Sequence, residues 1–224
     1  MKRLKAMLEA IAADAAATAE YTGRRALDSR VMAAMAKVPR HEFVPAADMG
    51  YAYVNEALPI GYGQTISQPF VVALMTDLLE PKPDHRILEI GTGSGYQAAV
   101  LAELAGHVYS IEAIPELAAE AGARLARLGY GNVTVKAGDG NDGWAEQAPF
   151  DGVIVTAAAA EIPGPLLQQL RAGGRLVIPI GPPRNQELTL VEKSAAGEIA
   201  ERVVLPVAFV PLVSVGGAPR HRVG

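Results

Sequence analysis

Three alternating glycines preceded by an acid form the part of this sequence best suited to binding a ligand. The run is Glu89-Ile90-Gly91-Thr92-Gly93-Ser94-Gly95, and it follows a short apolar stretch that begins at Ile87. Glycine has no Cβ, so the backbone can turn tightly and approach a bound molecule closely. In open α/β sheets, ligands bind at the carboxyl ends of the strands. The sequence therefore predicts a ligand site at residues 91–95, directly after a buried strand.

A second acid indicates what kind of ligand this is. Glu112 ends the next apolar run, His107 to Ile111, and a carboxylate there can accept both ribose hydroxyls of an adenosine. That feature alone does not separate NAD from S-adenosylmethionine (AdoMet). The dinucleotide fingerprint is G-x-G-x-x-G, whereas Tyr96 stands at the position of its third glycine. The E-x-G-x-G-x-G spacing favours AdoMet, which has no pyrophosphate to be held.

Further polar residues follow the later predicted strands. Asp139 and Gly140 come after a strand at 132–136, and Thr156 ends a strand at 150–156. We expect these residues to meet Glu89 and Glu112 in one crevice, because the carboxyl ends of parallel strands lie at the same edge of a sheet. Asp139 suits either of two roles, an acceptor for an adenine amino group or an Asx-turn between two glycines.

Ser67 lies in a connection that is expected to be irregular. Residues 55–70 contain Pro59, Gly61, Gly63 and Pro69, which disfavour regular structure. A loop of this length inside a compact domain is usually functional. Two roles for Ser67 stay open at this point: the N-cap of the helix predicted at 70–79, or a hydroxyl of the active site.

The elements that must position these residues alternate between strand and helix. Helices are expected at 3–19, from Asp28 or Ser29 to Pro39, and at 70–79, 97–104, 113–128 and 165–171; strands are expected at 87–90, 107–111, 132–136, 150–156, 175–180, 188–192 and 202–205. Repeated strand-helix units imply right-handed crossovers. We therefore predict a doubly wound α/β fold with a mostly parallel, seven-stranded sheet, whose last two strands form an antiparallel edge hairpin. Residues 1–55 would be a helical N-terminal extension, 56–215 the main domain and 216–224 a flexible tail.

Composition excludes several classes of function. The 224 residues include no Cys, which rules out disulfides, thiolate metal sites and Cys nucleophiles. No apolar run approaches the ~18 residues of a membrane-spanning helix, and Glu9 and Asp14 interrupt the Ala-rich start, unlike a signal peptide. The net charge of −4 argues against nucleic acid as a partner. We expect a cytoplasmic monomer that contacts no membrane.

Several stretches together resemble the bacterial protein-L-isoaspartate O-methyltransferase family. The more specific ones are Gln64-Thr65-Ile66-Ser67-Gln68-Pro69 and Phe209-Val210-Pro211-Leu212; Val38 to Pro45, Leu88 to Tyr96, Gly138-Asp139-Gly140 and Ile154 to Ala158 add to them. The resemblance covers residues 28–213. The stretch Tyr21 to Leu27 and residues 141–144 depart from the family pattern.

The resemblance implies a Rossmann-like, AdoMet-dependent methyltransferase that acts on the free α-carboxylate of isoaspartyl residues in damaged proteins and so begins their repair. Ser67 would be the catalytic residue, within a loop that covers the site. The implied cofactor contacts are Gln64, Thr65, Ile66, Glu89, Gly91, Thr92, Gly93, Glu112, Asp139, Gly140 and Thr156. Ser67, Leu212 and Val213 would contact the substrate. The chemistry requires no metal, since a carboxylate nucleophile is already ionised.

Other functions fit the sequence less well. Amino-nitrogen methylases carry Asp/Asn-Pro-Pro-Tyr after the fourth strand, where this chain has Thr156-Ala157-Ala158-Ala159, and cytosine-C5 methylases need a Cys. Tyr96 counts against a NAD-binding module, and the intact Ser67 against a non-catalytic AdoMet binder. A carboxyl methyltransferase acting on one specific peptide or metabolite stays open, because such relatives would keep the same motifs.

Overall fold

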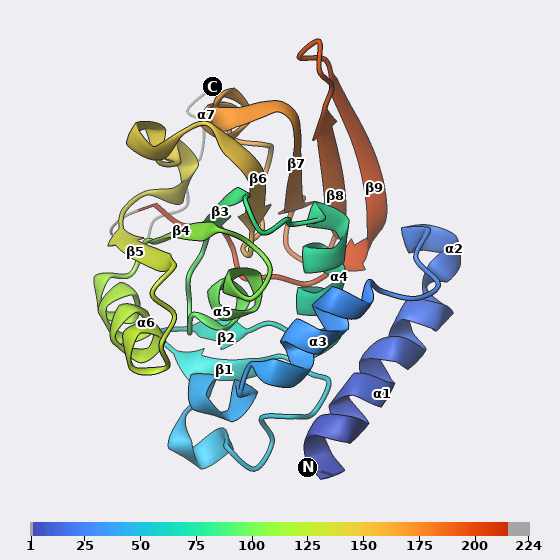
Figure 1. Cartoon of the computed structure of the whole chain (residues 1–224), viewed down its shortest axis with the longest axis vertical. Coiled ribbons are helices and arrows are strands. Elements are labelled where there is room, and N and C mark those ends of the chain that lie inside the picture. Colours follow the sequence, from blue (N-terminus) through green and yellow to red (C-terminus); the bar gives the residue numbers. More distant parts are fainter. Residues whose placement is uncertain (1, 215–224) are drawn as a thin grey trace.

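One seven-stranded sheet organises the chain (Figure 1). The computed structural model describes residues 2–214, and the predicted tail, 216–224, lies outside them. The strand order is β5-β4-β3-β6-β7-β8-β9. The bounds are β3 Arg86–Ile90, β4 His107–Glu112, β5 Val133–Ala137, β6 Phe150–Val155, β7 Leu170–Ile180, β8 Gln186–Lys193 and β9 Ile199–Val207. Strands β3 to β7 pair in parallel, and β8 and β9 are antiparallel. The predicted fold class and edge hairpin are therefore confirmed.

The direction of winding reverses beside β3. The chain proceeds from β3 through β4 to β5, then crosses to β6 on the other side of β3. Ligands in open α/β sheets bind at such a switch point. The glycine turn follows β3 and Thr156 follows β6, so both lie at the switch point.

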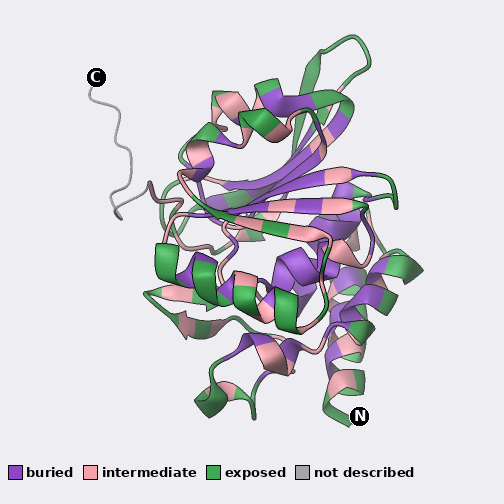
Figure 2. Ribbon diagram, turned by 60° about the vertical axis from the view of Figure 1, so that its left-hand side comes forward, coloured by how far each residue is buried: buried purple, intermediate pink, exposed green. Residues whose placement is uncertain are grey.

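Side chains alternate between two apolar layers, one on each face of the sheet. Ile87 belongs to one cluster and its neighbour Leu88 to the other, as the period of two in a strand requires. Helices α4 (Pro69–Leu79), α5 (Tyr96–Ala102) and α6 (Pro115–Arg127) lie on one side, and α7 (Gly164–Gln169) on the other (Figure 1). The central strands are largely buried (Figure 2), which explains their continuous apolar runs.

The N-terminal helices bury their apolar side chains in the same core as α4. They are α1 (Lys2–Ala17), α2 (Ala19–Thr22) and α3 (Ser29–Lys37), followed by 3-10 turns η1 (Arg40–Phe43) and η2 (Ala46–Asp48). Met7, Ile11 and Met35 are at most 1% exposed and join the cluster on that face. Asp28 caps α3 by accepting from the Arg30 amide. The N-terminal helices therefore pack against α4 and share its apolar core.

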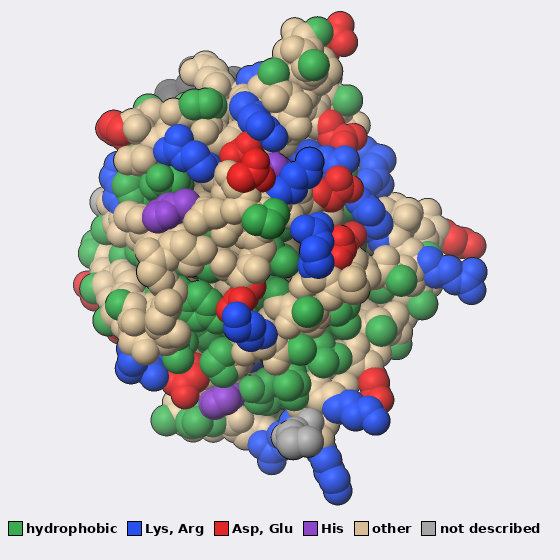
Figure 3. All heavy atoms as spheres, viewed as in Figure 1, with side chains coloured by type: hydrophobic (Ala, Val, Ile, Leu, Met, Phe, Trp, Pro, Cys, Tyr) green, Lys and Arg blue, Asp and Glu red, His purple; other side chains and the backbone are tan. Residues whose placement is uncertain are grey.

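Charged side chains also tie the extension to the sheet. Arg24 Nη2 lies 2.6 Å from Glu80 Oε1, which is also 2.6 Å from Arg175 Nη1, and Arg175 Nη2 lies 2.9 Å from Glu192 Oε1. Acidic and basic side chains lie side by side over this region in Figure 3. Partly exposed ion pairs of this kind each contribute little to stability. Apolar packing therefore contributes most of the stability of the extension on the rest of the protein. Within residues 2–214, no helix is long and apolar enough to cross a membrane.

Two expectations about local structure were wrong. Residues 55–70 contain an antiparallel hairpin, β1 (Leu58–Gly61) and β2 (Gln64–Ile66), instead of an irregular loop throughout. Its turn has positive φ at Gly61, Tyr62 and Gly63, so the glycines make the hairpin possible. The second error is that β7 begins at Leu170 instead of 175. Gly173 adopts a φ of +78° within the strand, where it accompanies a shift in register opposite Phe150 and Gly152.

Candidate functional site

The glycine turn is shaped mainly by its contacts with other parts of the protein. Gly91 has a φ of +95°, and a Cβ there would lie 2.5 Å from Thr156 Oγ1. The Thr156 hydroxyl shares its one proton between the carbonyls of Gly91 (2.6 Å) and Ile90 (3.0 Å), which fastens the turn to the end of β6. A Cβ on Gly95 would press against Leu125 of α6 at 3.2 Å. The first and third glycines therefore allow close packing, and the turn is held in one conformation.

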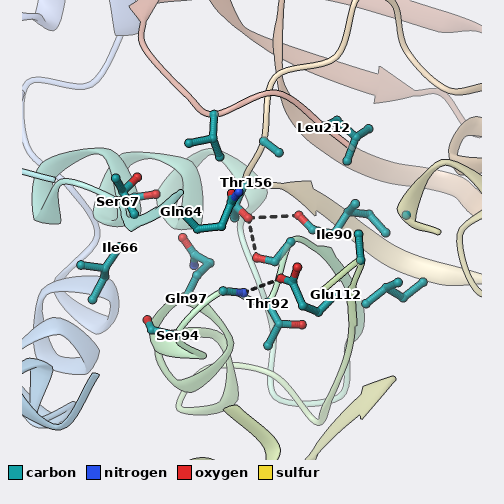
Figure 4. A pocket seen from close by; sticks show the side chains of 18 of the residues that line it. Gln64, Ile66, Ser67, Ile90, Thr92, Ser94, Gln97, Glu112, Thr156 and Leu212 are labelled. Carbon is teal, nitrogen blue, oxygen red and sulfur yellow. Dashed lines mark hydrogen bonds between the residues drawn. The ribbon is translucent and has the colours of Figure 1, made fainter. Parts of the chain in front are cut away.

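Glu112 is fixed with its carboxylate at the turn. The residue is 6% exposed, and its Oε2 accepts from the Gly93 amide at 2.8 Å while Oε1 accepts from the Ile114 amide at 3.1 Å. Two backbone donors leave further acceptor positions on each oxygen. Figure 4 shows the side chain at the wall of a pocket, where it can accept hydrogen bonds from a ligand.

Glu89 lies behind this wall. It is 0% exposed and does not line the pocket. It accepts a hydrogen bond from the Ser110 hydroxyl, which lies 2.6 Å from that of Thr92. Burial raises the pKa of Glu89 to about 8, and the nearby Glu112 adds to the rise. Glu89 is therefore a neutral acid at pH 7, linked to the pocket through Ser110 and Thr92.

Asp139 forms the Asx-turn that was one of its two expected roles. Its carboxylate accepts from the Asn141 backbone amide at 2.9 Å and from the Asn141 side chain at 2.8 Å. It does not line the pocket, but the following Gly140 does, and a Cβ on Gly140 would overlap Ile90. The structure thus brings the backbone at 140, not the Asp139 side chain, to the pocket wall.

The pocket collects most of the residues that the sequence singled out (Figure 4). About 700 Å³ of space between atoms, part of it open solvent, lies within its walls. The predicted residues that line it are Gln64, Thr65, Ile66, Ser67, Gly91, Thr92, Gly93, Glu112, Gly140, Thr156, Leu212 and Val213. Figure 4 shows Glu112 and Leu212 on one side and Ser67 and Ile66 on the other.

Ser67 is not a helix cap. The N-cap of α4 is Gln68, which makes no side-chain cap hydrogen bond, and Pro69 opens the helix. The backbone carbonyl of Ser67 accepts from Arg40 Nη2 at 2.8 Å. Arg40 is 0% exposed, donates to the Ala52 carbonyl at 2.8 Å and lies 4.7 Å from the centre of the Tyr96 ring. Buried hydrogen bonds from a guanidinium therefore hold the backbone of Ser67 in place while its side chain lines the pocket.

A groove adjoins the pocket at Ser67. Thr65, Ser67, Thr156 and Val210 line both hollows. The groove extends away from them along α4 and the segment after β9, and its walls include Phe70, Val71, Leu205, Val207 and Phe209. Leu212 and Val213, which were predicted to contact the substrate, line the pocket and not the groove.

The segment after β9 is fastened across the top of the sheet. The Leu212 amide donates to the Ala158 carbonyl at 2.7 Å, and the Ala158 amide donates to the Val210 carbonyl at 2.8 Å. Gln186 holds Phe209 by two further hydrogen bonds. This segment therefore forms a fixed wall between the pocket and the groove.

Sequence reasoning missed several residues in the pocket. Ser94, Tyr96 and Gln97 contribute to its wall, as do Ile90, Ile111 and the 210–211 segment. Burial raises the pKa of Tyr96 to about 12, so its hydroxyl stays neutral. Gln97 could have been noticed, because it is a polar residue in the first turn of a helix composed otherwise of apolar and small residues.

Comparisons with known proteins agree closely with one another. A family model described as protein-L-isoaspartate(D-aspartate) O-methyltransferase matches residues 17–217. A protein-L-isoaspartate O-methyltransferase 2 of Syntrophobacter fumaroxidans is 61% identical over 207 residues, which are 92% of this chain and 84% of the relative. Its namesake in Nitrosococcus oceani is 56% identical over 219 residues, which are 98% of this chain and 100% of the relative.

Solved structures show the same fold. One described as a protein-L-isoaspartate O-methyltransferase has a TM-score of 0.81 and 27% sequence identity, covering 96% of this chain and 67% of that one. Another, a Plasmodium falciparum protein described as a putative member and solved with S-adenosyl-L-homocysteine, has a TM-score of 0.74 at 24% identity, covering 93% and 97%.

Proposed function

The chain belongs to the protein-L-isoaspartate O-methyltransferase family, and from that premise we propose that its two hollows hold the methyl donor and the isoaspartyl chain on either side of Ser67. The enzyme uses AdoMet to methylate the free α-carboxylate of isoaspartyl residues in damaged proteins. The resulting ester can cyclise to a succinimide without further help, and hydrolysis then restores some normal aspartate.

The observation that carries the assignment of the two hollows is their shared wall. Thr65, Ser67, Thr156 and Val210 face both the pocket and the groove. A methyl group held in the pocket and a carboxylate held in the groove would therefore meet at these residues. The apolar groove wall between α4 and the segment after β9 suits an extended peptide chain.

The pocket residues fit AdoMet. Glu112 has acceptor capacity for the two ribose hydroxyls, because within the described part of the chain each of its oxygens accepts one backbone hydrogen bond and a carboxylate oxygen can accept more than one. The Gly140 backbone, which carries no side chain, and the apolar side chains of Ile111 and Leu212 line a part of the pocket that suits an adenine ring. When bound, AdoMet supplies a methyl group already activated by a positively charged sulfur.

The protein's own task is then to position the acceptor. The substrate carboxylate is ionised at neutral pH and needs no general base. The Ser67 hydroxyl would donate a hydrogen bond to this carboxylate and so orient it towards the pocket that would hold AdoMet. Orienting two reacting groups in this way can supply several kcal/mol. Arg40 stabilises this position of Ser67, because its guanidinium donates a hydrogen bond to the Ser67 backbone carbonyl.

The β1–β2 hairpin serves as the cover of the pocket. Ile60 lies over the glycine turn, since a Cβ on Gly93 would contact its Cδ1 at 3.4 Å. At the tip, the Tyr62 hydroxyl lies 3.4 Å from Glu120 of α6. A hairpin held down at this point keeps water from the substrate carboxylate and so preserves its reactivity.

The decisive experiment compares two peptides that differ only in one linkage. Radiolabelled methyl transfer from AdoMet is measured with an isoaspartyl peptide and with its normal aspartyl isomer. Isoaspartyl peptide should be strongly preferred, because its shifted backbone places a carboxylate where the isomer has an amide carbonyl, and a site built for one leaves its donors unpaired with the other. Equal rates would remove the repair function and favour a methyltransferase for one specific peptide or metabolite.

Three further expectations stay predictions: the cytoplasmic location, the monomeric state and the division of the chain at residue 55. The individual roles of the site residues are likewise proposals; Glu89 and Asp139 were expected to contact the cofactor, but their side chains lie off the pocket wall, and we propose no direct contact for them.

A further inference from the structure

Gln97 presents a buried acceptor to the pocket that the mechanism above does not use. Its side chain is 6% exposed and lines the pocket. Figure 4 shows the amide oxygen directed into the pocket, towards the side on which Ser67 lies. This oxygen has no hydrogen-bond partner among the residues that the structure describes. Buried polar atoms are rarely left unpaired in native proteins. We therefore expect the oxygen to accept a hydrogen bond from a bound ligand.

The orientation of the amide is fixed by its neighbours on α4. Gln97 Nε2 donates to Thr76 Oγ1 at 2.8 Å, and Thr76 Oγ1 donates to the Val72 carbonyl at 2.8 Å. The hydroxyl of Thr76 has a single proton, which goes to Val72, so it can only accept from Gln97. The NH2 group must therefore face Thr76, and the carbonyl oxygen must face the pocket.

The position of Gln97 selects among the donors that AdoMet offers. These are the adenine amino group, the two ribose hydroxyls and the α-ammonium of the methionine part. Glu112, the ribose acceptor, lies on the opposite side of the pocket from Ser67 (Figure 4), and Gln97 is directed towards the Ser67 side. The adenosine donors are thus placed elsewhere, which leaves the ammonium.

We propose that Gln97 Oε1 accepts a hydrogen bond from the α-ammonium group of AdoMet and so orients its amino acid tail. The inference rests on the proposed function, because it assumes AdoMet in this pocket. A hydrogen bond from a charged donor is stronger than one between neutral groups. The same oxygen repels the tail's carboxylate, so the two ends of the tail cannot exchange places.

Calorimetry with two ligands tests the proposal without turnover. The ligands are S-adenosyl-L-homocysteine and its deaminated analogue, in which hydrogen replaces the α-amino group. For the wild type, we expect the analogue to bind about 10- to 150-fold more weakly. Gln97→Leu should bind S-adenosyl-L-homocysteine more weakly by a similar factor, and removal of the amino group should then change its affinity by less than about threefold, since the pair is already broken.

Gln97→Glu is the matched variant, because it keeps an acceptor at the same position. Its affinity for S-adenosyl-L-homocysteine should be no more than about threefold weaker than that of the wild type, and it should still bind the deaminated analogue more weakly. Melting temperatures without ligand show whether each variant is folded. If Gln97→Leu does not fold, Gln97→Glu decides alone, and failure to discriminate between the ligands would overturn the proposal.

The other outcomes are distinct. Equal weakening of both ligands by Gln97→Leu would mean that the side chain only shapes the wall, which overturns the proposal. Unchanged S-adenosyl-L-homocysteine affinity with a raised KM for the isoaspartyl peptide would assign the oxygen to the substrate, which also overturns it. Failure of the wild type to bind S-adenosyl-L-homocysteine would instead reject the proposed function itself.

Discussion

Replacing Glu89 with Gln should flatten the dependence of stability on pH. Burial raises the pKa of Glu89 from an ordinary 4.5 to about 8. Between these values the folded protein keeps a proton that the unfolded chain has released. Stability from this group is therefore complete below pH 4.5, falls as the pH rises, and levels off above pH 8. A difference of this size corresponds to roughly 5 kcal/mol across the window.

The neutral amide of Gln removes this titration and keeps an oxygen that can accept from Ser110. Urea unfolding of wild type and Glu89→Gln at pH 5.5, 7 and 8.5 measures the effect. Between pH 4.5 and pH 8, the variant's free energy of unfolding, relative to wild type, should rise by about 1.4 kcal/mol per pH unit. Parallel curves for the two proteins would refute the reasoning, because they would mean that Glu89 ionises normally inside the fold.

Glu42→Gln is the control for this experiment. A hydrogen bond from Arg127 lowers the pKa of Glu42, so Glu42 is ionised in both folded and unfolded protein across the measured range. Its replacement should shift stability by an amount that changes little with pH, apart from the loss of its contact with His41, whose Nε2 lies 3.8 Å from Glu42 Oε1. The ligand is a second readout: Glu89→Gln should bind S-adenosyl-L-homocysteine within about threefold of wild type at pH 7, whereas loss of a direct charged contact would cost tenfold or more.

Three other substitutions test the site. Ser67→Ala should lower turnover by about 10- to 150-fold without changing the melting temperature, because Ser67 caps no helix; steady-state kinetics and a melting curve on one sample decide this, and unchanged turnover would remove Ser67 from the mechanism. Glu112→Ala should weaken S-adenosyl-L-homocysteine by about 1.5–3 kcal/mol in calorimetry, and tighter binding of NAD than of S-adenosyl-L-homocysteine to the wild type would contradict the cofactor assignment. Gly91→Ala should lower the free energy of urea unfolding by more than Gly197→Ala does. The backbone strain is similar, with φ at +95° and +87°, but only at Gly91 would the new Cβ collide with a neighbour, Thr156 Oγ1 at 2.5 Å. Equal losses would show that the structure relieves the collision.

The order and type of the main elements could be predicted because they depend on local pattern. Buried parallel strands such as β3 and β6 are nearly continuous apolar runs, and the amphipathic α6 has Pro115 in its first turn. Right-handed crossovers then leave few ways to arrange the sheet. The pocket position follows from the topology alone, which is why most of the predicted residues do line it.

The hairpin at 58–66 could not be predicted in this way. Its strands, β1 and β2, are only four and three residues long. The segment contains Pro59, Gly61 and Gly63, and proline and glycine are residue types that occur rarely in strands. The pairing is stabilised by its position over the glycine turn, where Ile60 approaches Gly93. The same holds for Arg40, whose partners at Ala52 and Ser67 are 12 and 27 residues away. Such contacts are tertiary and leave no periodic signal in the sequence.

The register of two strands explains why two similar acids have different positions. Glu89 pairs with Ser110, and β3 ends one residue later at Ile90, so its side chain stays between the sheet and α5. Glu112 lies two residues beyond Ser110 on the same face, past the end of β3, and its carboxylate reaches the Gly93 amide. Both acids occupy favourable motif positions, but only the one that extends past the neighbouring strand meets the pocket. The buried acid must then be neutral, since none of residues 2–214 supplies a cation to compensate an ionised carboxylate there and its desolvation is costly. A motif therefore identifies the edge of the sheet that binds the ligand, while the strand register decides which of its side chains contact it.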